Sequence, residues 1–213
     1  VYWKDGRPVH SNRVVVGSPE NQTPSLEKEF ASVVANPPWR VPAGIARREI
    51  LPRGPAYMAA RDMYMDNGMV VQRAGPQAAL GYVKFELRDS YAIFLHDTPT
   101  KAAFNLSNRQ RSHGCVRVQG AVEFARMLLA PDPERLDDFD MAQTTRETKR
   151  IQTGREIGVR LLYWTAFVDG RGRVAFREDG YKRDARLAQA LGLAVSLPDA
   201  VESAPEDPAD VGP

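Results

Sequence analysis

The N-terminal part of the chain carries short apolar runs separated by polar residues, which is the pattern of β-strands. Residues 1–3 and 14–16 are rich in β-branched and aromatic side chains, and the pair Asp5-Gly6 lies between them. Asp-Gly accommodates the positive φ angles of a tight hairpin turn. The pattern therefore predicts strands around a turn, followed by a polar loop that leads into a strand over residues 22–30.

The pattern changes between residues 36 and 79, because proline interrupts it repeatedly. The prolines of this stretch are Pro37, Pro38, Pro42, Pro52, Pro55 and Pro76. Residues 45–51 and 57–63 lie between prolines and have the composition of short helices. We therefore expect residues 36–79 to be an insertion built from short helices and loops.

Strand patterns return after this stretch. Residues 82–87 alternate between apolar and polar side chains, and residues 91–95 form a continuous apolar run, as in a strand that is buried on both faces. Residues 119–130 then place apolar side chains at helical intervals, and Pro131 ends that pattern. The sequence thus predicts two strands and then a helix.

The C-terminal part repeats the hairpin signal once more. Two strands are expected over residues 158–168 and 173–176, around the pair Asp169-Gly170, and a short helix is expected over residues 184–191. The final stretch, residues 193–213, is an acidic tail rich in proline and alanine, for which we expect little order. The predicted fold class is mainly β, of the α+β kind, with a few helices.

Composition narrows the classes of protein that fit. The chain has 213 residues, 43% of them hydrophobic, which is enough for one sizeable core. Its formal charge of +2 and the lack of a long basic run give no reason to expect a nucleic-acid partner. An apolar run of about 18 residues is also missing, so we expect no membrane span in this chain. The first residue is Val1 and no secretory signal follows it, so we expect a processed or excised part of a longer protein.

Cys115 is the only cysteine of the chain, so an internal disulfide is excluded. It lies in Ser112-His113-Gly114-Cys115-Val116-Arg117, and His96 precedes it within Phe94-Leu95-His96-Asp97-Thr98-Pro99. A free thiol has a pKa of about 8.5, so a nucleophilic cysteine needs an imidazole or another positive influence to ionise it. The two histidines therefore favour nucleophilic catalysis.

Other uses of these side chains remain open on the pattern of residues. A single cysteine is often a buried small hydrophobe, and a histidine after an apolar run is often structural. Three zinc ligands would also be available from Cys115, His96 and His113, although His113 and Cys115 are only two positions apart. We expect neither a metal nor a cofactor.

These motifs resemble the L,D-transpeptidases, the cysteine enzymes that crosslink bacterial peptidoglycan. The likeness extends over residues 9–185 and is strongest to the large periplasmic branch, which has an inserted cap. The matching stretches are Val14-Val15-Val16-Gly17, Gln22-Thr23-Pro24, Asn36-Pro37-Pro38-Trp39, Leu80-Gly81-Tyr82-Val83-Lys84-Phe85, His96-Asp97-Thr98-Pro99 and Tyr163-Trp164-Thr165-Ala166-Phe167-Val168-Asp169.

The resemblance implies a catalytic β-sandwich over residues 1–35 and 80–192, with residues 36–79 as an inserted capping subdomain. It also implies the catalytic roles. Cys115 would be the nucleophile, His96 the base, and Asp97 would orient the imidazole through its backbone carbonyl. His113 would assist by its position, and Gly114 would open the loop, whose backbone amides would form an oxyanion hole.

Three further residues are assigned to substrate binding. Arg117 suits a substrate carboxylate, although many family members carry asparagine there, and an ion pair within the protein is an equal alternative. Ser112 belongs to the same motif. Trp39 lies in the expected cap, where packing is the alternative to ligand contact.

The function that the resemblance implies is formation of 3→3 peptidoglycan crosslinks through a cysteine thioester, with stem peptides as partners and carbapenems as inhibitors. Its implied location is the periplasm or cell envelope. The same thioester would also serve hydrolysis, exchange of a D-amino acid, or attachment and release of envelope proteins. A noncatalytic module that binds peptidoglycan is the alternative from another class.

Overall fold

The computed structural model of the protein describes residues 1–88 and 93–193. An eight-stranded sheet forms its centre, with strands in the order β10-β3-β11-β9-β8-β4-β12 and with β13 also paired to β4. These strands are β3 (Val14–Gly17), β4 (Leu26–Ala35), β8 (Val83–Leu87), β9 (Leu95–His96), β10 (Gln110–Ser112), β11 (Val116–Val118), β12 (Lys149–Gln152) and β13 (Gly158–Leu161). The predicted mainly β fold class with some helices is confirmed.

The N-terminal hairpin follows the turn that its sequence predicts. β1 (Tyr2–Lys4) pairs antiparallel with β2 (Arg7–His10). Between them Asp5 and Gly6 have φ angles of 52° and 73°. Both angles are positive, as a two-residue turn that matches the twist of the strands requires.

β4 organises the large sheet because it is long enough to pair with three other strands. Its second half pairs antiparallel with β8 on one side and with β12 on the other, while its first half pairs with β13. Apolar side chains from these strands form the main core together with helix α3 (Ala121–Leu129). α3 buries Phe124, Ala125, Leu128 and Leu129, which are spaced for one helical face, as the sequence predicts.

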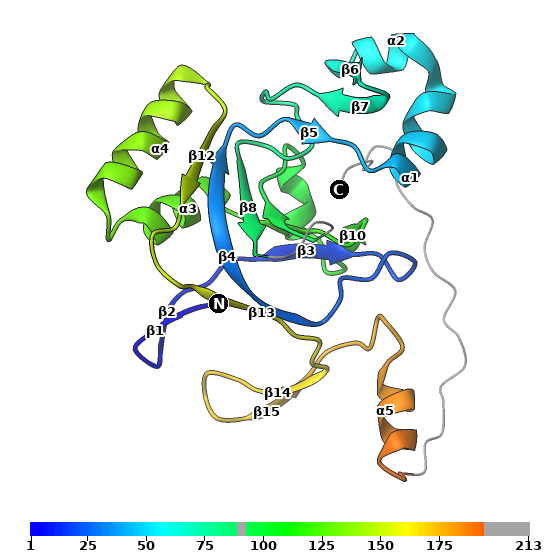
Figure 1. Ribbon diagram of the computed structural model, residues 1–213. Helices are drawn as coiled ribbons and strands as arrows, with labels where there is room; N and C mark the ends of the chain where they lie inside the picture. The colour runs from blue at the N-terminus through cyan, green and yellow to red at the C-terminus, as the bar shows by residue number, and fades with distance from the viewer. Residues whose placement is uncertain (89–92, 194–213) are drawn as a thin grey trace.

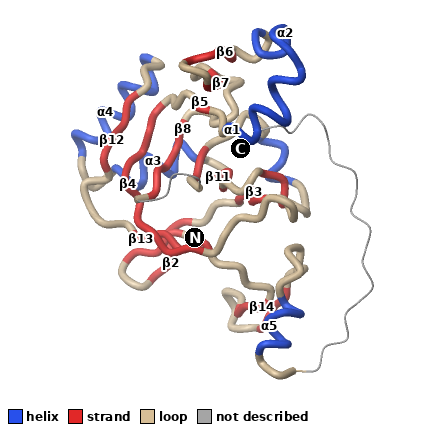
Figure 2. Tube along the Cα trace, turned by 45° about the vertical axis from the view of Figure 1, so that its right-hand side comes forward, coloured by secondary structure: helices blue, strands red, loops and turns tan. Residues whose placement is uncertain are grey.

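Helix α4 (Pro133–Thr145) was not expected from the sequence. Asp132 caps it by accepting a hydrogen bond from the Arg135 amide, and Pro133 occupies its first turn, where no amide donor is needed. Only Phe139 and Ala142 of this helix are buried. α4 packs beside α3 against the large sheet, as Figures 1 and 2 show at the left of each view.

The segment of residues 36–79, which we call the inserted segment, contains a sheet of its own. β5 (Trp39–Arg40), β7 (Met69–Gln72) and β6 (Met63–Asp66) form three antiparallel strands, whereas the sequence predicted only helices and loops. The remaining elements are α1 (Ala43–Ile45), the π-helical turn η1 (Ala46–Ile50), the 3₁₀ turn η2 (Leu51–Arg53) and α2 (Gly54–Ala59).

A second apolar cluster lies mostly within the inserted segment, and Phe94 from before β9 packs against it. Its buried members are Trp39, Val41, Ile45, Ala46, Ile50, Met63, Val70 and Leu80. None of these residues belongs to the main core cluster. Figure 1 shows α2, β6 and β7 at the upper right, on the other side of the large sheet from α4.

The C-terminal part carries a small hairpin and a helix. β14 (Ala166–Val168) pairs with β15 (Val174–Phe176), and α5 (Asp184–Ala190) follows, close to the predicted helix. The single strand expected over residues 158–168 is two strands, because pairing of β13 with β4 ends at Leu161. The 3₁₀ helix η3 (Lys101–Asn105) lies between β9 and β10.

Two predicted segments fall wholly or partly outside the described residues. The strand expected over residues 91–95 includes residues 91 and 92, and only Leu95 and His96 are described as strand. The tail expected over residues 193–213 lies outside them from residue 194.

Candidate active site

Adjacent strands of the large sheet bring His96 and the Cys115 loop side by side. β9 and β11 are parallel neighbours, with Leu95 opposite Val116 and His96 opposite Arg117. On the other side of β9, His96 lies opposite Lys84 of β8. Residues that are opposite one another in a sheet direct their side chains to the same face. Lys84, His96 and Arg117 therefore form a row across three strands.

The face that carries this row is opposite to the main core. Leu95 and Val116, which alternate with the residues of the row, are buried in the main core. Cys115 precedes β11 directly, and its thiol is close enough to Lys84 and Arg117 for their charges to act on it, so it lies on the face of the row. The sheet thus has the main core on one face and the row of Lys84, His96 and Arg117 on the other.

His96 is held in one orientation from the backbone. Its side chain is fully buried, and its Nδ1 lies in hydrogen-bonding contact with the carbonyl oxygen of Asp97. A carbonyl oxygen only accepts hydrogen bonds, so Nδ1 carries the proton of the neutral ring and Nε2 is the basic nitrogen. The contact is of the kind that the resemblance implies, and the catalytic role of Asp97 stays a prediction.

The Asp97 backbone is itself fixed. Its amide donates to the Val83 carbonyl at 2.8 Å, and its carboxylate accepts from the Tyr82 amide at 3.1 Å and pairs with Lys101. The carboxylate is therefore used to hold the strand end, and the carbonyl is the group that reaches His96.

The turn that contains Cys115 is closed by Ser112. The Ser112 hydroxyl donates to the Cys115 carbonyl at 2.5 Å and accepts from the Gly114 amide at 3.1 Å. Gly114 has a φ angle of 111°, in the region that favours glycine. Ser112 thus braces the turn, and the Gly114 amide donates to Ser112 in this conformation.

Burial raises the pKa of the Cys115 thiol to about 11. The backbone amide of Phe94 and the charges of Lys84 and Arg117 oppose this shift, because each of them stabilises a thiolate. The thiol form therefore predominates at neutral pH, and attack by sulfur requires a base that takes its proton.

His113 links the Cys115 turn to the inserted segment. Its Nε2 lies 2.9 Å from Oε1 of Glu49, which belongs to η1. Both side chains are about one-fifth exposed. Sequence reasoning did not find Glu49, because no motif marks it and the contact joins residues that are 64 positions apart.

The three residues assigned to substrate binding are all buried. Arg117 and Ser112 are each 1% exposed, and Trp39 is 2% exposed within the cluster of the inserted segment. Their assignment to substrate contact stays a prediction. In the structure, Ser112 holds the Cys115 turn by hydrogen bonds, and Trp39 packs in the apolar cluster.

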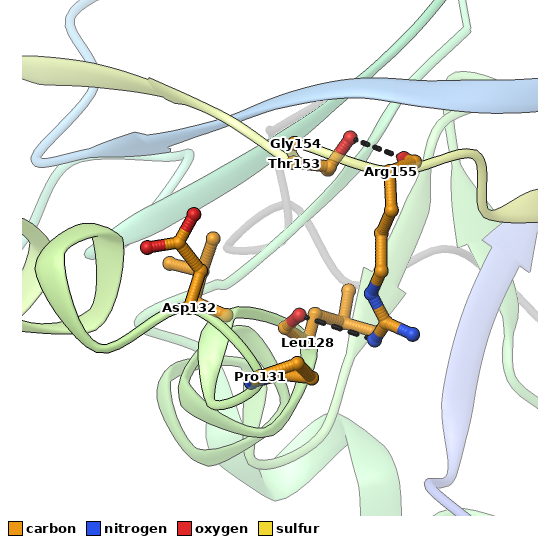
Figure 3. Close-up of a pocket in the computed structure, with 7 residues that line it drawn as sticks. Leu128, Pro131, Asp132, Thr153, Gly154 and Arg155 are labelled. Atoms are coloured by element: carbon orange, nitrogen blue, oxygen red, sulfur yellow. Dashed lines mark hydrogen bonds between the residues drawn. The ribbon is translucent and has the colours of Figure 1, made fainter.

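A pocket of about 160 Å³ lies elsewhere, between the end of α3 and the link from β12 to β13. Leu128, Pro131, Asp132 and Arg155 line it (Figure 3). It includes none of the residues of the candidate site. Within residues 1–88 and 93–193, no group of three or more His, Cys, Asp and Glu side chains is arranged to hold a metal ion.

Comparison with known families agrees with this geometry. The sequence profile of one family, the L,D-transpeptidase catalytic domain, matches residues 1–154 of the chain. The chain belongs to the L,D-transpeptidase family. This match contains His96, Cys115 and the whole inserted segment, and it ends within the link between β12 and β13.

An L,D-transpeptidase relative extends the likeness beyond residue 154. A Haemophilus influenzae protein, whose name assigns it provisionally to the L,D-transpeptidases, is 30% identical over 213 residues. The alignment covers 88% of this chain and 43% of the relative, so the chain spans less than half of the relative's length. No helix in the described part of the chain is long and apolar enough to cross a membrane.

Proposed function

We propose that the protein is a peptidoglycan L,D-transpeptidase that forms 3→3 crosslinks through a thioester on Cys115. The observation that supports this most is the pairing of β9 with β11, which sets a buried histidine beside the only cysteine on one face of the sheet. The basic nitrogen of that histidine is fixed, because Nδ1 is held by the Asp97 carbonyl. Family membership supports the same acyl transfer.

The first half-reaction transfers the stem peptide to the enzyme. Nε2 of His96 takes the thiol proton while sulfur bonds to the carbonyl carbon of the third stem residue. The carbonyl oxygen becomes an oxyanion, which backbone amides of the Cys115 turn stabilise. The bond to the terminal D-alanine then breaks, and the imidazolium returns the proton to the departing amine, which leaves a thioester.

The second half-reaction forms the crosslink. A side-chain amine of a second stem attacks the thioester, and its excess proton passes to His96. The carbon–sulfur bond breaks, and sulfur regains the proton as the amide forms. Because burial raises the pKa of the thiol to about 11, sulfur depends on His96 to take its proton in the first half-reaction.

We further propose that the inserted segment covers the acyl-enzyme as a capping subdomain. Its own sheet and apolar cluster support a separate unit, and Glu49 touches His113 two residues before the nucleophile. Covering the thioester would exclude water and favour attack by the amine. With peptidoglycan as substrate, the place of action is the periplasm or cell envelope.

The nucleophile is tested with two substrates. Cys115→Ala is expected to abolish both the crosslinking of purified muropeptides and the covalent mass increase with a carbapenem, each read by mass spectrometry. Acylation that persists in this variant would exclude Cys115 as the nucleophile. The muropeptide products also distinguish crosslinking from hydrolysis, from D-amino acid exchange and from a noncatalytic binding module.

The base is tested by His96→Ala, which is expected to slow acylation by about 10²- to 10⁴-fold. His10→Ala is the matched control, because His10 lies on β2 and its ring stacks on Phe124, away from the Cys115 turn. Activity of His96→Ala near that of the control would remove His96 from the role of base.

A further inference from the structure

The peptide bond between Gly114 and Cys115 is oriented by Thr23. The Thr23 hydroxyl donates to the Gly114 carbonyl at 2.9 Å. The peptide bonds of the described residues are all trans, so the carbonyl and the N–H of each peptide point in opposite directions. Thr23 therefore sets the direction of the Cys115 amide by holding the carbonyl at the opposite edge of the same peptide plane.

The Thr23 hydroxyl has its direction fixed in turn. It has one proton, which it gives to Gly114, and it accepts a hydrogen bond from the Gly17 amide at 2.8 Å. Thr23 is 9% exposed, so little water competes for these bonds. Gly17 has no room for a side chain, because a Cβ there would lie 2.0 Å from the Asn21 carbonyl oxygen.

Tyr181 closes the loop between Gly17 and Thr23. Its hydroxyl donates to the Gly17 carbonyl at 2.7 Å and accepts from the Thr23 amide at 3.2 Å. It is 6% exposed. One buried phenol thus holds both ends of the loop whose threonine orients the Gly114 carbonyl.

The position of Tyr181 depends on the C-terminal segment. Its ring stacks on Tyr163 with centroids 5.0 Å apart, and its amide donates to the Tyr163 hydroxyl at 3.0 Å. The Tyr163 hydroxyl donates to Asp179 at 2.5 Å. Burial and this hydrogen bond raise the pKa of Tyr163 to about 12, so its hydroxyl keeps its proton. All of these residues lie beyond residue 154, where the family match ends.

We propose that Thr23 and Tyr181 are positioning residues that aim the Cys115 backbone amide at the oxyanion of acyl transfer. Neither residue touches the substrate in this role. They act through the Gly114 carbonyl, and the C-terminal segment supplies the outer support. The inference rests on the proposed function, since it requires an acyl-enzyme on Cys115.

Two reactions of the same thiol test the role. Acylation by a carbapenem passes through an oxyanion, whereas alkylation by iodoacetamide displaces iodide from a saturated carbon and forms none. Thr23→Val and Tyr181→Phe are therefore expected to slow acylation by about ten- to a hundredfold. Their alkylation rates should remain within about twofold of the unaltered protein across the pH range, because neither change alters the base or the thiol.

Matched variants separate this effect from a loss of stability. Thr153→Val removes another buried threonine hydroxyl, which donates to the Arg155 carbonyl at 3.0 Å. Tyr2→Phe removes another tyrosine hydroxyl, which accepts from Arg155 at 3.2 Å. Both controls should be acylated at the original rate, and Thr23→Ser, which keeps the hydroxyl, should restore most of the rate.

The outcomes distinguish the two proposals. If the carbapenem does not acylate the unaltered protein, the proposed function fails and this inference fails with it. If acylation is normal in Tyr181→Phe and Thr23→Val, only the inference is overturned. A parallel loss of acylation and alkylation would also overturn it, because that result means damage to the whole site. If Thr23→Val does not fold, Tyr181→Phe alone tests the inference.

Discussion

At the residue scale, Cys115 combines a raised thiol pKa with a histidine on the neighbouring strand. Below a pKa of about 11, the thiolate fraction rises tenfold with each pH unit, so we expect the rate of alkylation by iodoacetamide to rise about tenfold per unit between pH 7 and pH 10. Mass spectrometry of timed samples measures this rate. A plateau that begins below pH 8 would instead indicate a stable thiolate–imidazolium pair and contradict the prediction.

Gly81 allows the backbone to pass close to the Asp97 side chain, because glycine has no Cβ. Its φ angle is 58°, and a Cβ there would lie 2.4 Å from the Asp97 carboxylate. Gly81→Ala is therefore expected to displace Asp97, whose carbonyl holds His96, and to lower kcat/KM by about tenfold or more. Strain at a positive φ angle should also cost about 1–3 kcal/mol of unfolding free energy.

Gly68→Ala is the control for the backbone strain. Gly68 has a φ angle of 80°, and nothing lies within 4 Å of the position of its Cβ. This variant should lose about 1 kcal/mol of stability, measured by urea unfolding, and keep its activity. Equal losses of activity in the two variants would mean that displacement of Asp97 is not the cause.

The sequence predicted contacts between residues that are close in the chain, but it did not predict the contacts between distant residues that hold the candidate site in place. The contact of His96 with Asp97 joins neighbours in the chain, so a motif carries it. Thr23 and Tyr181 are 158 positions apart, and only the folded sheet brings them together. Lys84 lies in a stretch that resembles the family, but its place opposite His96 follows from the pairing of β8 with β9.

At the element scale, the pair Asp-Gly predicted two hairpins that the structure contains, whereas a similar pair in the inserted segment was missed. Asp5-Gly6 predicted the first hairpin, while Asn67-Gly68 between β6 and β7 is an equally good signal. Because the prolines of the inserted segment favour loops, the sequence pattern predicted loops and short helices there instead of this hairpin. α4 was missed for another reason: only Phe139 and Ala142 are buried on it, so the helix has little apolar periodicity to detect.

The contact of Glu49 with His113 joins η1 to the Cys115 turn, and Glu49→Gln should weaken it by removing the charge. For a partly exposed hydrogen bond to a carboxylate the cost is about 0.5–1 kcal/mol, which corresponds to about two- to fivefold faster hydrogen exchange over residues 46–59. If the segment excludes water from the thioester, the hydrolysed share of the muropeptide products should also rise.

The control for this element is Glu27→Gln. Glu27 pairs with Arg160 at 2.7 Å on the exposed edge formed by β4 and β13, away from the Cys115 turn. It should leave both the exchange of residues 46–59 and the product ratio unchanged. Unaltered exchange in Glu49→Gln would show that this contact does not hold η1 in place.

At the scale of the whole molecule, the two larger apolar clusters of the described residues lie in different parts of the protein. The main cluster lies between the large sheet and the helices α3 and α4, while the other lies mostly within the inserted segment and also includes Leu80, with Phe94 packed against it. The candidate site lies on the sheet face turned away from the main cluster, and Glu49 of the inserted segment contacts His113 across 64 positions of the sequence. Cys115 and His96 thus lie on the large sheet, and the segment that contains most of the second cluster adjoins them through Glu49.

This division predicts different consequences for the loss of one buried side chain in each cluster. Phe139 and Ile50 are both fully buried, and their replacement by alanine costs about 3–5 and 2–5 kcal/mol respectively. Phe139→Ala should lower the melting temperature of the whole protein by roughly 10 °C. Ile50→Ala should instead speed hydrogen exchange over residues 39–72 and leave exchange in β4, β8 and β11 within about twofold. Equal acceleration in the large sheet and in the inserted segment would mean that the two clusters unfold together, and a separately moving cap would then be excluded.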